Sequence, residues 1–293
     1  MTSELHEAET DDDLAAMIAL RERLDPFTAT TVGDQRVFLS QASAPLVLVA
    51  PDVAFAHVMR YPFERDAVVD GGVAQEHRRR GLGSGLLHRV LDHARAQEWP
   101  SLLASAVEEE GIAWLGRRRF VAIDRQEPVV LELAGRPPVD VRVPDGIELT
   151  DFAARPELAP QLHDLIVEGL EDVPGALAED VPTLEAWLEW QRAPSRRADF
   201  LVIAVDGGDP VGYAQLHVYP RVGYHGFTVV ARSHRGRGIA RTLKEELIRR
   251  SQARGLDRLL TNSNEANVPM RTLNGELGYV PGPTRVYMRR ELD

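Results

Sequence analysis

One segment of the sequence occurs twice, about one domain length apart. Residues 73–91 match residues 230–248 position by position, and arginines and small residues occupy the same places in both copies. Each copy follows a hydrophobic stretch and continues into apolar residues at helical spacing. Because self-similarity at this separation is typical of a duplicated structural unit, the sequence predicts two domains of one fold. A length of 293 residues accommodates both.

A proline-rich stretch separates the two copies. Residues 134–138 read Ala-Gly-Arg-Pro-Pro, which cannot continue a helix or lie inside a sheet. We therefore expect an N-terminal domain over residues 1–135 and a C-terminal domain over residues 139–293.

The order of the expected elements is the same in both halves. Each half begins with helical sequence, continues through strands that lead into the repeated loop, and ends with a strand, a short helix and two more strands. In the first half we place them at residues 11–24, 46–50, 53–59, 67–73, 102–106 and 112–117, with two strands within 120–133. In the second half we place them at residues 158–170, 183–191, 200–205, 211–218, 224–230, 258–261 and 268–276, with two strands within 279–292. This order predicts an α/β (α+β) fold with a mixed sheet flanked by helices.

Composition removes several classes of function. The sequence has no cysteine, which excludes disulfides, thiolate zinc sites and cysteine nucleophiles. His88 and His93 share an expected helix without a metal-binding spacing, so we expect no metal. The net charge of −11 argues against a nucleic-acid partner and favours a cationic or neutral one. Since no apolar run is long enough to cross a bilayer and the N-terminus is acidic, we expect a cytoplasmic protein without a membrane partner, as a monomer or homodimer.

The repeated loop is rich in glycine and arginine and lies between an expected strand and an expected helix. Backbone amides at such a place hold an anion together with the helix N-terminus, and glycines let the backbone approach it. Neither copy carries Gly-Lys-Ser or Gly-Lys-Thr, which excludes a P-loop, and Leu86 stands where a dinucleotide fingerprint requires glycine. Ser84 does not lie in a hydrolase nucleophile motif, because Leu82 takes the place of that motif's first glycine.

The pattern that remains is Arg-x-x-Gly-x-Gly/Ala, present as Arg78 to Gly83 and again as Arg235 to Ala240. This pattern resembles the loop of the GNAT acyltransferase superfamily, and the fused arrangement is similar to that of mycothiol synthase and other tandem GNAT proteins. The resemblance implies two tandem GNAT folds, each with a mixed, mostly antiparallel sheet flanked by helices, and acetyl-CoA (coenzyme A) as the cofactor. In that family the loop amides hold the coenzyme diphosphate. The strand before the loop diverges from the next strand, and its free backbone groups hold pantetheine and the thioester carbonyl.

By this resemblance, the cofactor-binding residues of the second copy lie in the loop, in the strand before it, and in a string of asparagines after it. They are Val229, Val230, Arg235, Gly236, Arg237, Gly238, Ile239, Ala240, Asn264, Asn267, Met270 and Asn274. Asparagine amides both donate and accept hydrogen bonds, as the amides of pantetheine require. Asn267 has a second interpretation, since it precedes Val268 and Pro269 at a position where asparagine caps a helix.

The reacting centre implied by the resemblance lacks the family's usual acid and base. Where many members have a tyrosine acid, the two copies have Leu115 and Asn274. Where many have a glutamate base, the copies have Ala67 and Tyr224. The candidates for catalysis in the second copy are Val230, Tyr224, His225 and Asn264.

The expected roles of these candidates differ. The amide of Val230 is the oxyanion donor that the resemblance implies. Tyr224 and His225, with His217 on the adjoining strand, could relay a proton through water, and each is equally well explained as a packed strand residue.

The first copy departs from the family beyond its loop. The substituted positions are Val107 for Asn264, Glu110 for Asn267 and Arg119 for Gly278. Two interpretations of its loop stay open, a diphosphate site and a solvated basic turn without a ligand; the residues concerned are Arg78, Arg80, Gly81 and Gly83. We therefore expect the chemistry to take place in the C-terminal copy.

The expected function is transfer of acetyl from acetyl-CoA to the primary amine of a small molecule. Residues 145–189 hold 12 acidic residues and a single base, Arg155, which favours a cationic acceptor. We expect Glu171, Asp172 and Glu179 to face that acceptor, and the alternative for most of these acids is a solvated surface. Two other functions remain open: an acyl-CoA-binding module without transfer, and an acetyltransferase that acts on a protein N-terminus or lysine.

Overall fold

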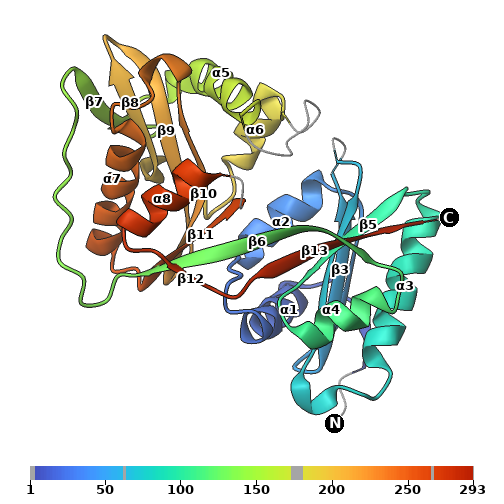
Figure 1. The fold of residues 1–293 in the computed structure, drawn as a ribbon. Coiled ribbons are helices and arrows are strands. Elements are labelled where there is room, and N and C mark those ends of the chain that lie inside the picture. The colour runs from blue at the N-terminus through green and yellow to red at the C-terminus, as the bar shows by residue number, and fades with distance from the viewer. Residues whose placement is uncertain (1–3, 62–63, 173–180, 265–266, 293) are drawn as a thin grey trace. The chain divides into compact units, whose positions relative to one another are not determined.

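The chain forms two compact units, each a mixed sheet with helices packed on it. The structure is a computed structural model that describes residues 4–61, 64–172, 181–264 and 267–292. Residues 1–126 together with 283–293 make unit 1, and residues 127–282 make unit 2. The α/β fold class expected from the sequence is confirmed (Figure 1).

The helices and strands follow the expected order closely. Those up to residue 132 are β1 (His6–Glu7), α1 (Asp11–Leu24), α2 (Val32–Gln41), β2 (Ser43–Ala50), β3 (Ala54–Arg60), β4 (Ala67–Val73), α3 (Leu82–Ala96), β5 (Ser101–Ala106), α4 (Glu109–Gly116) and β6 (Val121–Glu132). Those that follow are β7 (Ile147–Asp151), α5 (Ala159–Leu170), α6 (Leu184–Trp190), β8 (Leu201–Asp206), β9 (Asp209–Val218), β10 (Val222–Val230), α7 (Ile239–Arg254), β11 (Arg258–Asn264), α8 (Val268–Glu276), β12 (Val280–Pro281) and β13 (Arg285–Glu291).

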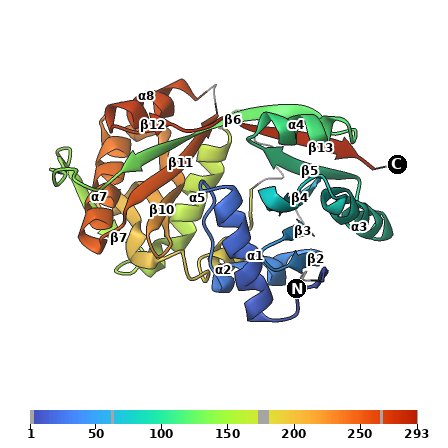
Figure 2. The same cartoon turned by 90° about the horizontal axis from the view of Figure 1, so that it is seen from below.

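Unit 1 has the strand order β1-β2-β3-β4-β5-β13-β6. Only β4 and β5 are paired in parallel among its described strands, through Ala67 with Leu102 and Val68 with Leu103. Apolar residues of α1 form one core with β2 and β3, and those of α3 form a second core with β3, β5 and β13. Because β2 and β3 direct alternate side chains into the two cores, α1 and α3 cover opposite faces of the sheet (Figure 2).

The helix α2 is missing from the sequence prediction. Thr31 caps its N-terminus, with the hydroxyl oxygen 3.1 Å from the Asp34 amide that donates to it. The pair is a capping signal of the kind that also starts α1, where Thr10 and Asp13 cap each other. Thr31 followed three residues later by Asp34 is the sequence signal that predicts the start of α2.

Unit 2 has the order β6-β11-β10-β9-β8-β7, with β12 paired to β6. Its strands are antiparallel wherever their pairing is described, except β10 and β11, which are parallel. One core lies between the sheet and α7, and a second lies between the sheet and α5 with α6. Figure 1 shows α7 with α8 on one side of these strands and α5 with α6 on the other.

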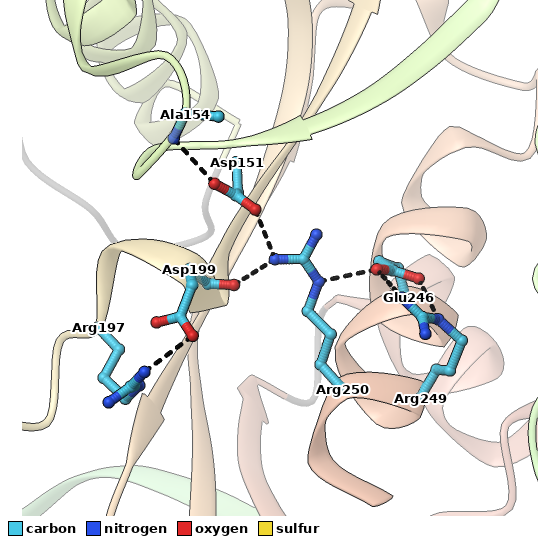
Figure 3. Close-up of polar contacts among 7 residues, drawn as sticks. All are labelled: Asp151, Ala154, Arg197, Asp199, Glu246, Arg249 and Arg250. Carbon is cyan, nitrogen blue, oxygen red and sulfur yellow. Dashed lines mark hydrogen bonds and ion pairs between the residues drawn. The ribbon is translucent and has the colours of Figure 1, made fainter. Parts of the chain in front are cut away.

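Charged side chains fix the C-terminal part of α7 in place. Arg250 donates to Asp151 at the end of β7 (2.8 Å), to the backbone carbonyl of Asp199, and to Glu246 on its own helix (2.7 Å), as Figure 3 shows. Burial opposes the charged form of Glu246, yet hydrogen bonds from Arg249 and Arg250 hold its pKa below the ordinary value. These contacts fasten α7 to the strands whose ends they reach, and so fix the orientation of the loop that precedes it.

The last strand of the chain belongs to the first unit. The strand β13 pairs with β5 from Val286 to Glu291 and with β6 through residues 121–126, so it lies between them. Two strands were expected within residues 120–133, and this was wrong: a single strand, β6, continues through Pro128 without a turn. The expected linear boundary between residues 135 and 139 stays a prediction, since the compact units follow strand pairing and not chain order.

No helix of the described part of the chain is both long and apolar enough to cross a membrane.

Candidate functional site

The second copy of the repeated loop begins α7 with two glycines in the left-handed region. Gly236 has φ +78° and Gly238 has φ +84°, which L side chains rarely adopt. At either glycine, no described heavy atom lies within 4 Å of the position that a Cβ would take. No described side chain caps α7, so this turn presents backbone amides at a helix N-terminus, as an anion requires.

The strands that lead to this loop diverge. The parallel pairing of β10 with β11 covers three residue pairs and ends at Tyr224 with Leu260. Beyond that point β10 stays paired with β9 alone among the described residues, through a bulge between His225 and Thr228. Bulges of this kind end pairing and redirect side chains beside functional sites. The result is an opening between β10 and β11 that leads towards the loop.

The backbone of Val230 faces this opening. Ala231 donates its amide hydrogen to Val211 on β9 (2.9 Å), and consecutive residues of an antiparallel strand direct their backbone groups to alternate sides. The amide of Val230, which lies opposite Gly212 in the register, is therefore directed away from β9. Its carbonyl accepts a hydrogen bond from Arg235 Nε (3.0 Å), which ties the loop to the strand.

The asparagines of the second copy have different environments. Asn267 caps α8, accepting the Met270 amide at 3.3 Å, so the capping interpretation is confirmed. Asn274 is buried, and neither atom of its side-chain amide has a partner among the described residues. Asn264 is the last residue of β11, and its side chain lies outside what the structure describes.

The three candidates for a proton relay are not brought together. Tyr224 lies opposite His217 in the register, with ring centroids 6.2 Å apart. His225 follows Tyr224 and is directed to the other face, where its ring lies 6.0 Å from the ring of Tyr279. Burial, and then the charge of Arg196, lower the pKa of His217 to about 3, and burial also lowers the pKa of His225. Both rings are therefore neutral and poorly matched to general-base catalysis near neutral pH.

Two of the acids expected to face the acceptor are engaged within the protein. Asp172 pairs with Arg232 (2.8 Å) and Arg235 (2.7 Å), and Glu171 pairs with Arg232 (3.0 Å). Hydrogen bonds from Arg232 and then Arg235 hold the pKa of Asp172 at about 2. The loop arginines therefore neutralise these two carboxylates, and their expected place facing the acceptor stays a prediction; Glu179 lies outside the described residues.

A cavity of about 470 Å³ lies beside the second loop. Its lining includes the loop residues Arg237 and Gly238, Arg241 of α7, and Arg142 with Val143 from the segment before β7. Thr242 donates to the carbonyl of Arg142 (2.8 Å) and holds that segment against α7. Arg237 also pairs with Asp206 (3.1 Å). The cavity therefore combines three arginines and two acids, Asp140 and Glu245, with a helix N-terminus.

The loop of unit 1 has the same backbone but different surroundings. Arg79 (φ +64°) and Gly81 (φ +85°) repeat the two left-handed positions, and Arg78 Nε donates to the Val73 carbonyl at 3.1 Å. Arg78 also pairs with Glu108 at 3.1 Å. The adjoining strand β4 pairs with β3 without a bulge. The left-handed turn is thus conserved within the chain, while the bulge occurs in unit 2.

Bulky side chains cover the start of α3 in unit 1. A Cβ on Gly83 would lie 3.4 Å from the indole of Trp114, and the Arg118 guanidinium lies over that indole at 3.7 Å. Arg118 also donates to Ser84 on the first turn of α3 (2.9 Å). By the repeat, Leu273 stands where unit 1 has Trp114. The wall beside the first loop is therefore larger and more polar than the wall beside the second.

Comparison with known proteins gives the family. Residues 4–113 and 161–279 match the acetyltransferase (GNAT) family. The chain belongs to this family. The two matched regions contain both copies of the loop, so the GNAT resemblance seen in the sequence and its tandem arrangement are confirmed. A comparison with curated protein sequences gave no match.

Solved GNAT structures share this fold over the whole chain. A tandem GNAT protein from the clavulanic acid biosynthesis pathway is 21% identical, with a TM-score of 0.76, covering 99% of this chain and 98% of that one. A GCN5-related N-acetyltransferase from Sphaerobacter thermophilus is 19% identical, with a TM-score of 0.71 and coverage of 98% and 96%. A GNAT-family acetyltransferase from Colwellia psychrerythraea is 13% identical, with a TM-score of 0.58 and coverage of 99% and 100%.

Sequence reasoning missed the bulge that distinguishes the two GNAT units. Gly226 lies at its centre, and a Cβ there would come within 2.7 Å of His217 Nε2. A glycine inside a strand is the available signal, since it often marks a bulge or a close approach. Unit 1 has Val69 at the matching position of β4 and keeps a regular ladder there.

Proposed function

We propose that this GNAT protein transfers an acetyl group from acetyl-CoA to the primary amine of a small molecule, and that the transfer takes place in unit 2. The observation that carries the proposal is the opening between β10 and β11 beside the bulge of β10, a bulge that β4 of unit 1 lacks; the opening leads to a helix N-terminus at Gly236 and Gly238. Backbone amides there suit a diphosphate, and free strand backbone suits the amides of pantetheine. This is the arrangement in which the family holds its coenzyme.

Other parts of unit 2 fit the coenzyme. Three arginines line the cavity beside the loop; Arg237 and Arg241 are paired with carboxylates, and Arg142 has no described ion pair, so its guanidinium is available to a phosphate. The buried, unpartnered amide of Asn274 suits a ligand that supplies the missing hydrogen bonds. Acetyl-CoA would supply the activated acyl group there. Val230 would direct its amide towards the developing oxyanion, and the walls of the opening would exclude water.

The acceptor is proposed to be cationic. The protein carries a net charge of −11, and residues 145–189 include acids without a described ion pair, such as Asp145, Glu148, Asp164 and Glu185, beside five that are paired with arginines. A field of this sign attracts ammonium groups and repels carboxylates. A polyamine or an aminoglycoside-like sugar should therefore be a better acceptor than glutamate.

The test is release of thiol from acetyl-CoA in the presence of a panel of amines and peptides. The protein has no cysteine, so a thiol reagent reports the coenzyme alone. We expect turnover with small cationic amines and little with acidic amines or peptides. Turnover with peptides alone would instead indicate a protein acetyltransferase.

A binding module without transfer is the second candidate. It is favoured by the neutral, buried state of His217 and His225, which leaves neither ring suited to act as a base. Binding of acetyl-CoA by calorimetry, with no thiol release for any amine or peptide of the panel, would establish this alternative.

A further inference from the structure

Lys244 is the only lysine in the sequence, and its side chain is buried, with 1% of the residue exposed. The other 33 of the 34 basic residues are arginines. A guanidinium stays charged in any protein environment, whereas a buried ammonium loses its proton readily. A chain that uses arginine everywhere else has a titratable amine at this one position, on the helix that begins at the candidate coenzyme loop.

The rings of Tyr279 and His225 lie near Lys244 in unit 2. The ammonium nitrogen lies 5.5 Å from the centre of the Tyr279 ring, and that ring lies 6.0 Å from the ring of His225. The Tyr279 hydroxyl, both ring nitrogens of His225 and both amide atoms of Asn274 are buried without a hydrogen-bond partner among the described residues. No described carboxylate forms an ion pair with Lys244. Asn274 adjoins Tyr279, whose amide donates to the Asn274 carbonyl at 3.0 Å, and we call Lys244, His225, Asn274 and Tyr279 the buried cluster.

The buried cluster lies where the strands diverge. His225 directly follows Tyr224, the last residue of β10 that pairs with β11. Asn274 stands at the position where many members of the family have a tyrosine acid. Buried polar groups are nearly always satisfied, so five unpartnered atoms at one place indicate water or a ligand that completes them.

The ligand best suited to the buried cluster is an anion. A buried ammonium without a carboxylate gains most from a ligand that brings negative charge, and every other member of the cluster is uncharged. In acyl transfer, the bond between the acyl carbon and sulfur breaks and the electron pair stays on sulfur. The amine nitrogen meanwhile bonds to that carbon and releases one proton, and one proton finally reaches sulfur. The carbonyl oxygen carries the negative charge in the tetrahedral intermediate, and the sulfur carries it as the acyl–sulfur bond breaks.

We propose that Lys244 is a positioning residue whose charge, acting across the buried cluster, stabilises the thiolate of coenzyme A in unit 2. This inference rests on the proposed function. It gives the site a positive charge that stabilises the departing sulfur, in place of the tyrosine acid for which this sequence has Asn274.

The protonation of the neighbours supports this assignment. Burial lowers the pKa of Lys244 to about 7. Burial lowers the pKa of His225 and of His217 on β9, and burial raises the pKa of Tyr279 against a smaller opposing effect of the Arg136 charge. Among these groups, Lys244 alone changes charge near neutral pH. A unit charge roughly 10 Å from a titrating group, at an effective dielectric constant of about 20, shifts the pKa of that group by about one unit; an effect of this size is expected between Lys244 and the bound sulfur.

The first experiment uses the unmodified protein. Because there is one lysine, protein labelled with 13C-lysine gives one side-chain signal, whose NMR titration reports the pKa of Lys244 directly. The titration is repeated with coenzyme A oxidised to its sulfonate, which is permanently anionic at sulfur, and with desulfo-coenzyme A, which is neutral there. We expect the sulfonate to raise the pKa of Lys244 by about one unit relative to the desulfo analogue.

The second experiment compares Lys244→Arg with Lys244→Met. Since the chain has no cysteine, alkylation of coenzyme A measures the thiolate fraction in the complex at each pH. We expect the bound thiol to titrate about one pH unit lower in Lys244→Arg than in Lys244→Met, a difference of about tenfold in thiolate. Calorimetry establishes that both variants bind coenzyme A.

The outcomes separate this inference from the proposed function. Equal pKa values of Lys244 with the two bound analogues would overturn the role of Lys244 and leave the coenzyme site intact. Equal thiol titration in two folded, coenzyme-binding variants would do the same. Failure of both analogues to bind would overturn the proposed function itself.

Discussion

Matched substitutions in the two loops test which unit holds the coenzyme. Gly238 and Gly81 begin α7 and α3 with φ of +84° and +85°, and neither has a described atom within 4 Å of a Cβ. Gly238→Glu and Gly81→Glu therefore carry the same backbone strain, about 1–2 kcal/mol each. Any further difference between the variants comes from what binds at the loop.

The expected effect on binding is large for one variant alone. A glutamate carboxylate roughly 5 Å from a bound phosphate, at an effective dielectric constant of about 20, costs about 3 kcal/mol, or about 100-fold in affinity. We expect Gly238→Glu to lose coenzyme A binding by this factor and to lose turnover with it. Gly81→Glu should leave both nearly unchanged, since Trp114 and Arg118 contact Gly83 and Ser84 beside that loop and β4 lacks the bulge of β10.

Calorimetry with coenzyme A and the thiol-release assay measure the two effects, and thermal unfolding verifies that both variants fold. Equal losses in the two folded variants would refute the claim of one working unit. Unchanged affinity in folded Gly238→Glu would refute the assignment of the second loop.

Three further predictions concern charge. The pKa of Lys244 falls from 10.5 to about 7 on folding, so the unfolded chain binds more protons between these pH values. The free energy of unfolding should therefore rise with pH, by up to about 1.4 kcal/mol per pH unit, which denaturation at pH 7 and 9 measures. Lys244→Met should abolish this rise and be more stable than the unsubstituted protein at pH 7. Asp172→Asn should leave Arg232 and Arg235 less neutralised and tighten coenzyme A binding several-fold at low salt, and an unchanged or weaker affinity would contradict this. With a cationic acceptor, kcat/KM should fall as ionic strength rises from about 0.01 to 0.15 M, over which the screening length shrinks from about 30 to 8 Å, whereas a rate indifferent to salt would exclude steering.

The local parts of the fold were predictable from the sequence. The strand β4 and the helices α1 and α8 have the expected bounds, because periodicity and capping residues act over a few positions. The place of the repeated loop between a strand and a helix was also predictable, whereas the left-handed backbone of Gly236 and Gly238 was not stated from the sequence. The stacking of Arg118 on Trp114 in unit 1 was not predictable, because the sequence presents the two residues as ordinary members of a short helix and its end.

The site was less predictable, because its properties arise from side chains that meet across elements. Tyr224 and His225 are neighbours in sequence and lie on opposite faces of the sheet. Asp172 is acidic in the sequence and neutralised in the structure by arginines 60 and 63 positions away. Lys244 reads as one basic residue on an amphipathic helix, and burial against Tyr279 is what gives it a pKa near neutrality.

The strand β13, which follows unit 2 in the sequence and lies in the sheet of unit 1, sets the order in which the chain can fold. Arg285 of β13 contacts Ser105 of β5 across 180 residues of sequence, and all of unit 2 is encoded between them. A ribosome adds about 5–20 residues per second, so the sheet of unit 1 waits roughly 10–35 s for its missing strand. During that time β5 and β6 have exposed edges in the growing chain, where a chaperone, or the corresponding strand of a neighbouring nascent chain, can pair with them first.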